Sequence, residues 1–116
     1  MNDFITKDSG VRQDYPSGMS RDSQDDKPDF SLMFPDMPYE LQPLTRFADL
    51  MTRGAVKYGR RNWQMANSVE ELERFRASAF RHFIQWHCGE TDEDHMAAVM
   101  FNLLAYEHTK FTLEDK

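Results

Sequence analysis

Three stretches of the chain carry apolar residues at helical spacing, and each has its own start or stop signals. The first runs from Pro43, whose fixed φ suits the first turn of a helix, to Gly59, a residue type common at helix ends. The second begins at Ser68 and ends before Gly89, and the third begins at Thr91. Because Ser68 and Thr91 are each followed three residues later by an acidic residue, both match the capping-box pattern. No strand pair is indicated, so the sequence predicts an all-α protein with three main helices.

Each predicted helix has an apolar face that we expect to be buried. The residues of a face recur every three or four positions. They are Leu44, Phe47, Ala48, Met51, Ala55 and Tyr58 in the first helix, Leu72, Phe75, Ala79, Phe83 and Trp86 in the second, and Met96, Val99, Met100, Leu103, Leu104 and Tyr106 in the third. A domain of 116 residues buries only about 60 to 70% of the surface of its unfolded chain. We therefore expect a compact bundle of three main helices that is completed by oligomerisation, as a homo-oligomer.

Residues 1–30 differ in composition from the rest of the chain. They contain seven Asp, four basic residues and two Pro, without a sustained apolar period. Such a segment cannot pack by itself, so we predict an extended N-terminal arm that is acidic and mostly coil. The apolar segment 30–35 ends at Pro35 and is expected to lie extended across the helices and anchor the arm. The helical domain is then residues 31–116.

Charge and cysteine content exclude several classes of protein. The formal net charge is -6, whereas non-specific binding of a nucleic acid polymer depends on many distributed Lys and Arg side chains. We therefore expect no nucleic acid polymer as a partner. Cys88 is the single cysteine, so no intramolecular disulfide can form. No apolar run approaches the roughly 20 residues that span a bilayer, and the interpretation is a cytoplasmic protein without a membrane partner.

Residues 52–63 combine cationic and aromatic side chains around two glycines. From Arg46 to Arg61 the chain has five basic residues and one acidic residue, a local charge of +4. Arginine contacts phosphate oxygens in pairs, lysine adds a point charge, and an aromatic ring offers a flat face to a base. The pattern indicates a site for a nucleotide, and the expected contacts are Arg53, Lys57, Tyr58, Arg60, Arg61, Asn62 and Trp63, with Asn102 as a further candidate. The structural alternative is that basic residues favour the end of a helix and that Trp63 anchors the core.

A second group of polar residues lies around the second and third predicted helices. Imidazole and carboxylate groups at a helix junction can hold a divalent metal or move protons. The candidates for catalysis and for metal binding are His82, Glu90, Asp94 and His95. Each also has an ordinary alternative, since His82 can be a hydrogen-bonded core residue and Asp94 can cap its helix. The pairs Glu70 with Glu73 and Glu90 with Glu93 are assigned to helix starts and to solvated surface.

Several of these motifs together are similar to one family, named for the N-terminal region of dATP/dGTP diphosphohydrolases and found in phages and bacteria. The resemblance covers the chain from about Arg21 to Tyr106. It is carried by Thr52-Arg53-Gly54-Ala55-Val56-Lys57-Tyr58-Gly59-Arg60-Arg61-Asn62-Trp63, Arg21-Asp22-Ser23-Gln24, Lys27-Pro28-Asp29-Phe30-Ser31-Leu32, Arg81-His82-Phe83-Ile84-Gln85-Trp86, His95 and Phe101-Asn102-Leu103-Leu104.

The resemblance implies a helical, phage-type protein that converts deoxynucleoside triphosphates to monophosphates and pyrophosphate, working in the cytoplasm of an infected bacterial host. The chain also resembles the all-α nucleotide pyrophosphohydrolases of the MazG type, which implies a dimer with Mg²⁺ held by carboxylate pairs on facing helices. It departs from that pattern, because His95 and Ala98 stand where the second pair would be, and His82 and Gln85 replace the first. A cage of carboxylates for Mg²⁺ is not evident.

The leading hypothesis is a dNTP diphosphohydrolase with a purine preference and a Mg²⁺ or Mn²⁺ cofactor, in which residues 31–116 form the nucleotide-binding domain. The alternative is a non-catalytic protein that binds or sequesters a nucleotide with the same basic cluster. A third class is a helical module that binds another protein through that cluster.

Overall fold

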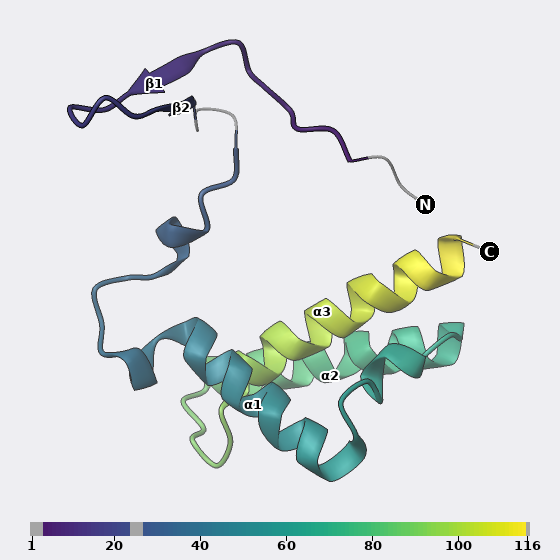
Figure 1. The fold of residues 1–116 in the computed structure, drawn as a ribbon. Helices are drawn as coiled ribbons and strands as arrows, with labels where there is room; N and C mark the ends of the chain where they lie inside the picture. The colour runs from purple at the N-terminus through teal and green to yellow at the C-terminus, as the bar shows by residue number, and fades with distance from the viewer. Residues whose placement is uncertain (1–3, 24–26, 116) are drawn as a thin grey trace. The chain divides into compact units, whose positions relative to one another are not determined.

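The protein is described by a computed structural model that covers residues 4–23 and 27–115 and divides into two units, Met1–Leu32 and Met33–Lys116. It is mostly helical, with three α-helices and one small sheet (Figure 1). The elements in chain order are β1 (Arg12–Asp14), β2 (Ser20–Asp22), the 3-10 helices η1 (Phe30–Met33) and η2 (Tyr39–Leu41), α1 (Pro43–Tyr58), the 3-10 helix η3 (Trp63–Met65), α2 (Val69–His87) and α3 (His95–Glu114). None of the described helices is both long and apolar enough to cross a membrane.

The first unit contains a short antiparallel hairpin, so the prediction that the chain has no strand pair is wrong. β1 pairs with β2 in a register that places Arg12 opposite Asp22. Asp22 accepts hydrogen bonds from the Ser9 N–H (3.1 Å) and from Lys27 Nζ (2.8 Å). The hairpin is held by polar groups rather than by an apolar face, so hydrophobic periodicity could not reveal it. Residues 1–3 and 24–26 of the predicted arm, including Gln24 of the family motif, and Lys116 lie outside the described residues.

The apolar segment after the hairpin forms a turn of 3-10 helix where an extended segment was expected, and that prediction is wrong. The Asp29 carboxylate accepts hydrogen bonds from the Ser31 N–H (3.0 Å) and from Ser31 Oγ (2.5 Å). These local contacts start the turn, as Asp commonly does through its own following backbone. Phe30 and Leu32 are exposed.

The boundaries of α1 and the start of α2 confirm the sequence signals. Pro43 is the first residue of α1, and Gly59 caps it with a φ of 98°, a backbone conformation that favours glycine. Before α2, Ser68 Oγ accepts from the Glu71 N–H (3.1 Å), and the Glu71 carboxylate accepts from the Asn67 N–H (3.0 Å). The capping box therefore fixes where α2 begins.

The third helix begins at His95, four residues later than predicted from Thr91. Its N-cap is Asp94, whose Oδ1 accepts from the Ala97 N–H (3.1 Å). Arg46 of α1 donates from Nε and Nη2 to the two oxygens of the same carboxylate, and this bidentate contact fixes Asp94 at the helix start. A contact to a residue 48 positions away favours Asp94 over the predicted Thr91 as the N-cap, and local sequence does not show that contact.

Small and polar side chains fill the interior of the second unit. Helix α3 packs along α2, and α1 crosses the first half of α3 (Figure 1). The buried residues of the two packed helices are Ala79 and His82 on α2 and His95, Ala97, Ala98, Asn102, Ala105 and Thr109 on α3. Six residues predicted to be buried are exposed, so the prediction is wrong for Ala48, Tyr58, Phe83, Trp86, Leu103 and Leu104. Leu103, for example, is 53% exposed and Phe83 is 48% exposed. Short side chains let the two helices approach closely, which leaves the large apolar side chains on the flanks.

Candidate functional site

The basic segment of the sequence lines a cavity of about 600 Å³ in the second unit. Its walls come from the second half of α1, from the turn that follows and from two residues near the start of α3. The lining residues are Leu50, Met51, Thr52, Arg53, Gly54, Ala55, Lys57, Tyr58, Gly59, Arg60, Asn62, Trp63, Glu93 and Phe101. A volume of this size matches that of ordinary small-molecule sites, which span roughly 300 to 1,000 Å³.

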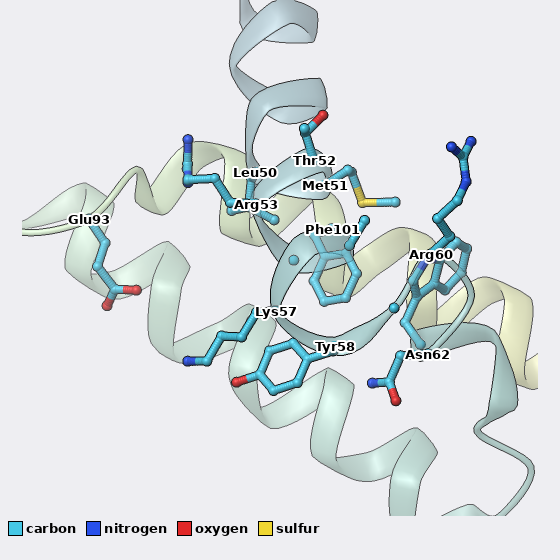
Figure 2. A pocket seen from close by; sticks show the side chains of 14 residues that line it. Leu50, Met51, Thr52, Arg53, Lys57, Tyr58, Arg60, Asn62, Glu93 and Phe101 are labelled. Carbon is cyan, nitrogen blue, oxygen red and sulfur yellow. The ribbon is translucent and has the colours of Figure 1, made fainter.

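Helical spacing and one glycine turn arrange the polar groups of this cavity. Arg53 and Lys57 are four residues apart on α1, so they project from the same face of the helix. Gly59 then reverses the chain and brings Asn62 and Trp63 back to the cavity wall. Figure 2 shows Lys57 on the side of the cavity where Glu93 lies, whereas Arg60 projects on the other side.

The cations of the cavity form no ion pair with a carboxylate of the described residues, although the charge of Arg53 contributes to lowering the pKa of the Asp94 carboxyl. Arg53, Lys57 and Arg60 are exposed, and none of them lies within 4.0 Å of a described carboxylate. Arg46 lies about two turns before Arg53 on α1 and differs from these cations, because its guanidinium donates two hydrogen bonds to the Asp94 carboxylate. Unpaired guanidinium and ammonium groups around a concave surface favour an anionic ligand, and phosphate groups fit them well.

Three aromatic residues line the cavity, and two of them, Tyr58 and Trp63, come from the basic segment and have different surroundings. The Trp63 ring makes edge contacts with Phe101 (ring centroids 6.1 Å apart) and with His108 (5.3 Å), so it anchors η3 against α3. Tyr58 as a residue is 62% exposed, and Lys57 Nζ lies 5.0 Å from the centroid of its ring. Tyr58 is therefore the ring with a face available to a ligand, while Trp63 has the structural role that the sequence left open as an alternative.

Two buried histidines meet beside the cavity. His82 of α2 and His95 of α3 have their Nδ1 atoms 2.9 Å apart. His95 Nε2 lies 2.8 Å from Asp92 Oδ1, and His82 Nε2 lies 3.3 Å from Arg81 Nη2. A carboxylate can only accept, so His95 Nε2 carries a proton, and the neutral ring then accepts at Nδ1 from His82. His82 in turn accepts at Nε2 from the Arg81 guanidinium.

The electrostatics of this pair keep His82 neutral. Burial lowers the pKa of the His82 imidazole below its ordinary value, and the positive charge of Arg81 lowers it further. The hydrogen bond from His95 lowers the pKa of the Asp92 carboxyl. A neutral His82 has a lone pair that can bind a metal ion or accept a proton at neutral pH.

Glu93 connects the histidine pair with the cavity. One nitrogen of His82, one of His95 and one carboxylate oxygen of Glu93 lie within 4.8 Å of one another, a spacing that could hold a metal ion. Glu93 is exposed and also lines the cavity that contains Arg53 and Lys57. We call His82, Glu93 and His95 the histidine cluster. The cavity and the histidine cluster therefore share one side chain.

The other residues singled out in the sequence lie outside the histidine cluster. Asp94 accepts from Arg46 Nε (2.8 Å) and Nη2 (2.7 Å), and these hydrogen bonds lower the pKa of its carboxyl. Glu90 is exposed at the end of α2, where its N–H donates to the Gln85 carbonyl (3.0 Å). Asn102 is buried and donates to the Ala98 carbonyl of its own helix (2.8 Å). Arg61 is exposed and is not among the described residues that line the cavity.

Sequence reasoning missed Glu93 and assigned it to the solvated first turn of a helix. The structure starts α3 at His95, so Glu93 belongs to the turn before the helix and its side chain is free to face both histidines. Glu93 is only two residues before His95 in the sequence, and this closeness could have indicated that the two side chains lie near each other. The roles of Arg46, Asp92 and Arg81 depend on contacts between or around helices and had no signal in the sequence.

The comparison with protein-family models gives a match to most of the chain. A protein-family model described as dATP/dGTP diphosphohydrolase, N-terminal, matches residues 17–116. This range includes all of the cavity and the whole histidine cluster. Neither the curated proteins nor the solved structures contain a match to the chain.

Proposed function

Because the chain belongs to the dATP/dGTP diphosphohydrolase N-terminal family, we propose that it binds a purine deoxynucleoside triphosphate in the cavity and cleaves it to the monophosphate and pyrophosphate. One observation carries this proposal. Unpaired cations line a cavity of nucleotide size, and Glu93 joins that cavity to two buried histidines. Binding groups and groups suited to activate water thus lie side by side.

Different residues of the cavity bind different parts of the nucleotide. Arg53 and Lys57 contact the phosphates, because they project together toward the side where Glu93 lies (Figure 2). The exposed Tyr58 ring stacks on the base, and Asn62 donates to the sugar or the base from the turn after α1. Arg60 contributes positive charge at the opposite wall, and Arg61 adds to the attraction of a polyanion from outside the cavity.

The residues present do not fit the Mg²⁺ site that the resemblance to MazG-type enzymes implies. Mg²⁺ prefers oxygen ligands in near-ideal octahedral geometry. The described side chains that meet here offer two imidazoles and a single carboxylate, and the nearby Asp94 is engaged by Arg46. The groups that bind the substrate and move its protons are therefore side chains of this chain rather than a Mg²⁺ cage.

The reaction requires attack of water on the α-phosphorus. A bond forms between the water oxygen and this phosphorus, the bond to the bridging oxygen breaks, and pyrophosphate leaves with the electron pair. The proton of the water passes to the Glu93 carboxylate, the group of the histidine cluster that also lines the cavity. Arg53 and Lys57 stabilise the charge that develops on the phosphate oxygens.

The test is product analysis after incubation of the purified protein with each of the four dNTPs and Mn²⁺ or Mg²⁺. We expect equal amounts of monophosphate and pyrophosphate, with dATP and dGTP cleaved faster than dCTP and dTTP. Lys57→Met should reduce the rate at low substrate concentration, whereas Lys110→Met, the same change at an exposed position of α3 away from the cavity, should not. The proposal fails if no dNTP yields a monophosphate, or if the product is inorganic phosphate.

A nucleotide-binding protein without catalysis remains the second candidate, favoured by the misfit between this donor set and a Mg²⁺ cage. It predicts calorimetric binding of dATP or dGTP that is the same with and without EDTA, together with no turnover. Binding of the nucleotide to the folded state alone would still raise the midpoint of thermal unfolding.

We also propose that the protein is a homodimer in which two copies cover an apolar groove between α2 and α3. The groove has a volume of about 430 Å³, and its apolar lining includes Phe80, Phe83 and Leu103. Arg76 and Glu107 also line it. A two-fold contact that pairs Arg76 of one copy with Glu107 of the other would make this surface complementary to itself.

The oligomeric state is measured by sedimentation at several protein concentrations. We expect a dimer that dissociates when Leu103 is changed to Glu. Val69→Glu is the matched control, since Val69 is 65% exposed on α2 and does not line the groove. A monomer at all concentrations, or equal dissociation by both variants, contradicts the dimer.

A further inference from the structure

The histidine cluster has the donor set of a transition-metal site. Its three ligand atoms lie within 4.8 Å of one another, and two of the three residues are buried, so their rings are held in place. The cluster draws His82 from α2, His95 from α3 and Glu93 from the turn between them. Two imidazoles with one carboxylate leave further coordination positions open, which is typical of sites for first-row transition ions.

The hydrogen bonds around His95 prepare it as a ligand. Asp92 Oδ1 accepts from His95 Nε2 at 2.8 Å, which leaves the lone pair of the neutral ring on Nδ1. Histidines that bind metals commonly donate their other ring N–H to a carboxylate in this way, which fixes the ring and raises its basicity. The Nδ1 lone pair of His95 points at His82 Nδ1, 2.9 Å away.

A metal ion needs only a small change at this pair. At bond lengths of about 2.05 Å, two nitrogens bound tetrahedrally to one ion lie roughly 3.3 Å apart. The Nδ1 atoms would therefore separate by a few tenths of an ångström from 2.9 Å. His82 would move its proton from Nδ1 to Nε2, and the Arg81 guanidinium, now facing a donor at 3.3 Å, would turn away. Arg81 is exposed and already lies 3.4 Å from Gln85 Oε1, so it can do so.

We propose that His82, Glu93 and His95 bind one first-row transition ion, such as Mn²⁺, Co²⁺ or Zn²⁺, in preference to Mg²⁺. Imidazole is a good ligand for these ions and a poor one for Mg²⁺. Glu93 places the ion at the edge of the cavity, where its open positions face the phosphates of a nucleotide. The role of the ion in catalysis rests on the proposed function, whereas its binding does not.

The experiment is calorimetric titration of the EDTA-treated, dialysed protein with Mn²⁺, Co²⁺, Zn²⁺ and Mg²⁺ in the absence of nucleotide. We expect one transition ion per chain, bound at least a hundredfold more tightly than Mg²⁺. Co²⁺ gives a second readout, because its visible absorption reports imidazole coordination. Glu93→Gln should weaken binding tenfold or more, and since Glu93 is exposed, this variant should still fold.

Two matched controls separate this site from incidental metal binding. Glu90→Gln removes a neighbouring exposed carboxylate, and His87→Gln removes an exposed histidine of the same helix as His82. Neither change should alter ion affinity or the Co²⁺ spectrum. The proposal is overturned if Mg²⁺ binds as tightly as Mn²⁺, if no ion binds, or if a control variant loses as much affinity as Glu93→Gln. If ions bind as expected while no dNTP is cleaved, the metal site stands and the proposed function fails.

Discussion

The cavity and the histidine cluster adjoin through Glu93, but the chain builds them in opposite ways. The cations of the cavity come from one continuous segment, are exposed and have no carboxylate within 4.0 Å among the described residues. The histidines come from two helices, are buried, and have their ring nitrogens engaged by Asp92, Arg81 and each other. Charge left unpaired at a surface serves binding, whereas groups fixed by neighbours keep the geometry that coordination and proton transfer need.

The largest effect is expected when the cations of the cavity are removed, because nucleotide affinity should fall while metal affinity is kept. In the double variant Arg53→Met/Lys57→Met, affinity for dATP or dGTP measured with EDTA should fall a hundredfold or more. Each charge-assisted hydrogen bond contributes about 1.5 to 3 kcal/mol, and 1.4 kcal/mol corresponds to tenfold. Mn²⁺ affinity without nucleotide should stay within twofold. Equal losses of both affinities would mean that the cavity and the cluster are not separable.

The complementary change acts on the histidine cluster alone. Asp92→Asn replaces the carboxylate that accepts from His95 Nε2 with a neutral amide of the same shape. Loss of such an outer partner typically lowers metal affinity ten- to a hundredfold. Calorimetry should show this loss for Mn²⁺ and an unchanged nucleotide affinity in EDTA. Unchanged Mn²⁺ affinity would contradict the orienting role of Asp92.

A third prediction concerns Asp94, which ties α1 to the start of α3. Asp94→Ala removes an N-cap and leaves Arg46 without its partner, so the free energy of unfolding should fall by about 1 to 2 kcal/mol from the cap alone. Asp94→Asn is the matched variant, because Asn caps as well as Asp while the charge is lost. Denaturant unfolding should therefore show a smaller loss for Asn. Equal losses would indicate that the Arg46 pair, not the cap, matters.

The smallest expected effect is a pH dependence of the protein's stability that comes from His82 and not from the cavity. The pKa of His82 is lowered in the folded protein, so the unfolded chain takes up this proton first as the pH falls. In EDTA, the contribution of His82 to the free energy of unfolding should be fully present above about pH 6.5, the ordinary pKa of histidine. It should decrease as the pH falls below this value. His82→Gln should remove this part of the pH dependence, while Arg53→Met should keep it. A pH profile unchanged by His82→Gln would contradict burial of a neutral imidazole.

The sequence predicted the parts of the fold that depend on local signals. Pro43 and Gly59 bound α1 as expected, and the Ser68 capping box starts α2. The hairpin and the start of α3 were not predicted, because Asp22 and Asp94 are placed by Lys27 and Arg46 rather than by an apolar pattern.

The same distinction applies to the site. The contiguous segment that contains Arg53 and Lys57 was visible in the sequence and does line one cavity. His82 and His95 were also singled out, but their third partner depended on where α3 begins. Glu90 and Glu93 are chemically identical and three residues apart, and the fold alone places Glu93 with the histidines.

The claim that a nucleotide and a metal ion meet at Glu93 is tested most directly by phosphorus NMR. The probe is α,β-methylene dATP, which cannot be cleaved at the α-phosphate, bound to the protein with substoichiometric Mn²⁺. We predict strong paramagnetic broadening of the phosphate resonances that disappears in Glu93→Gln and persists in Glu90→Gln. Broadening that survives Glu93→Gln unchanged, or no broadening although both ligands bind, would contradict the shared site.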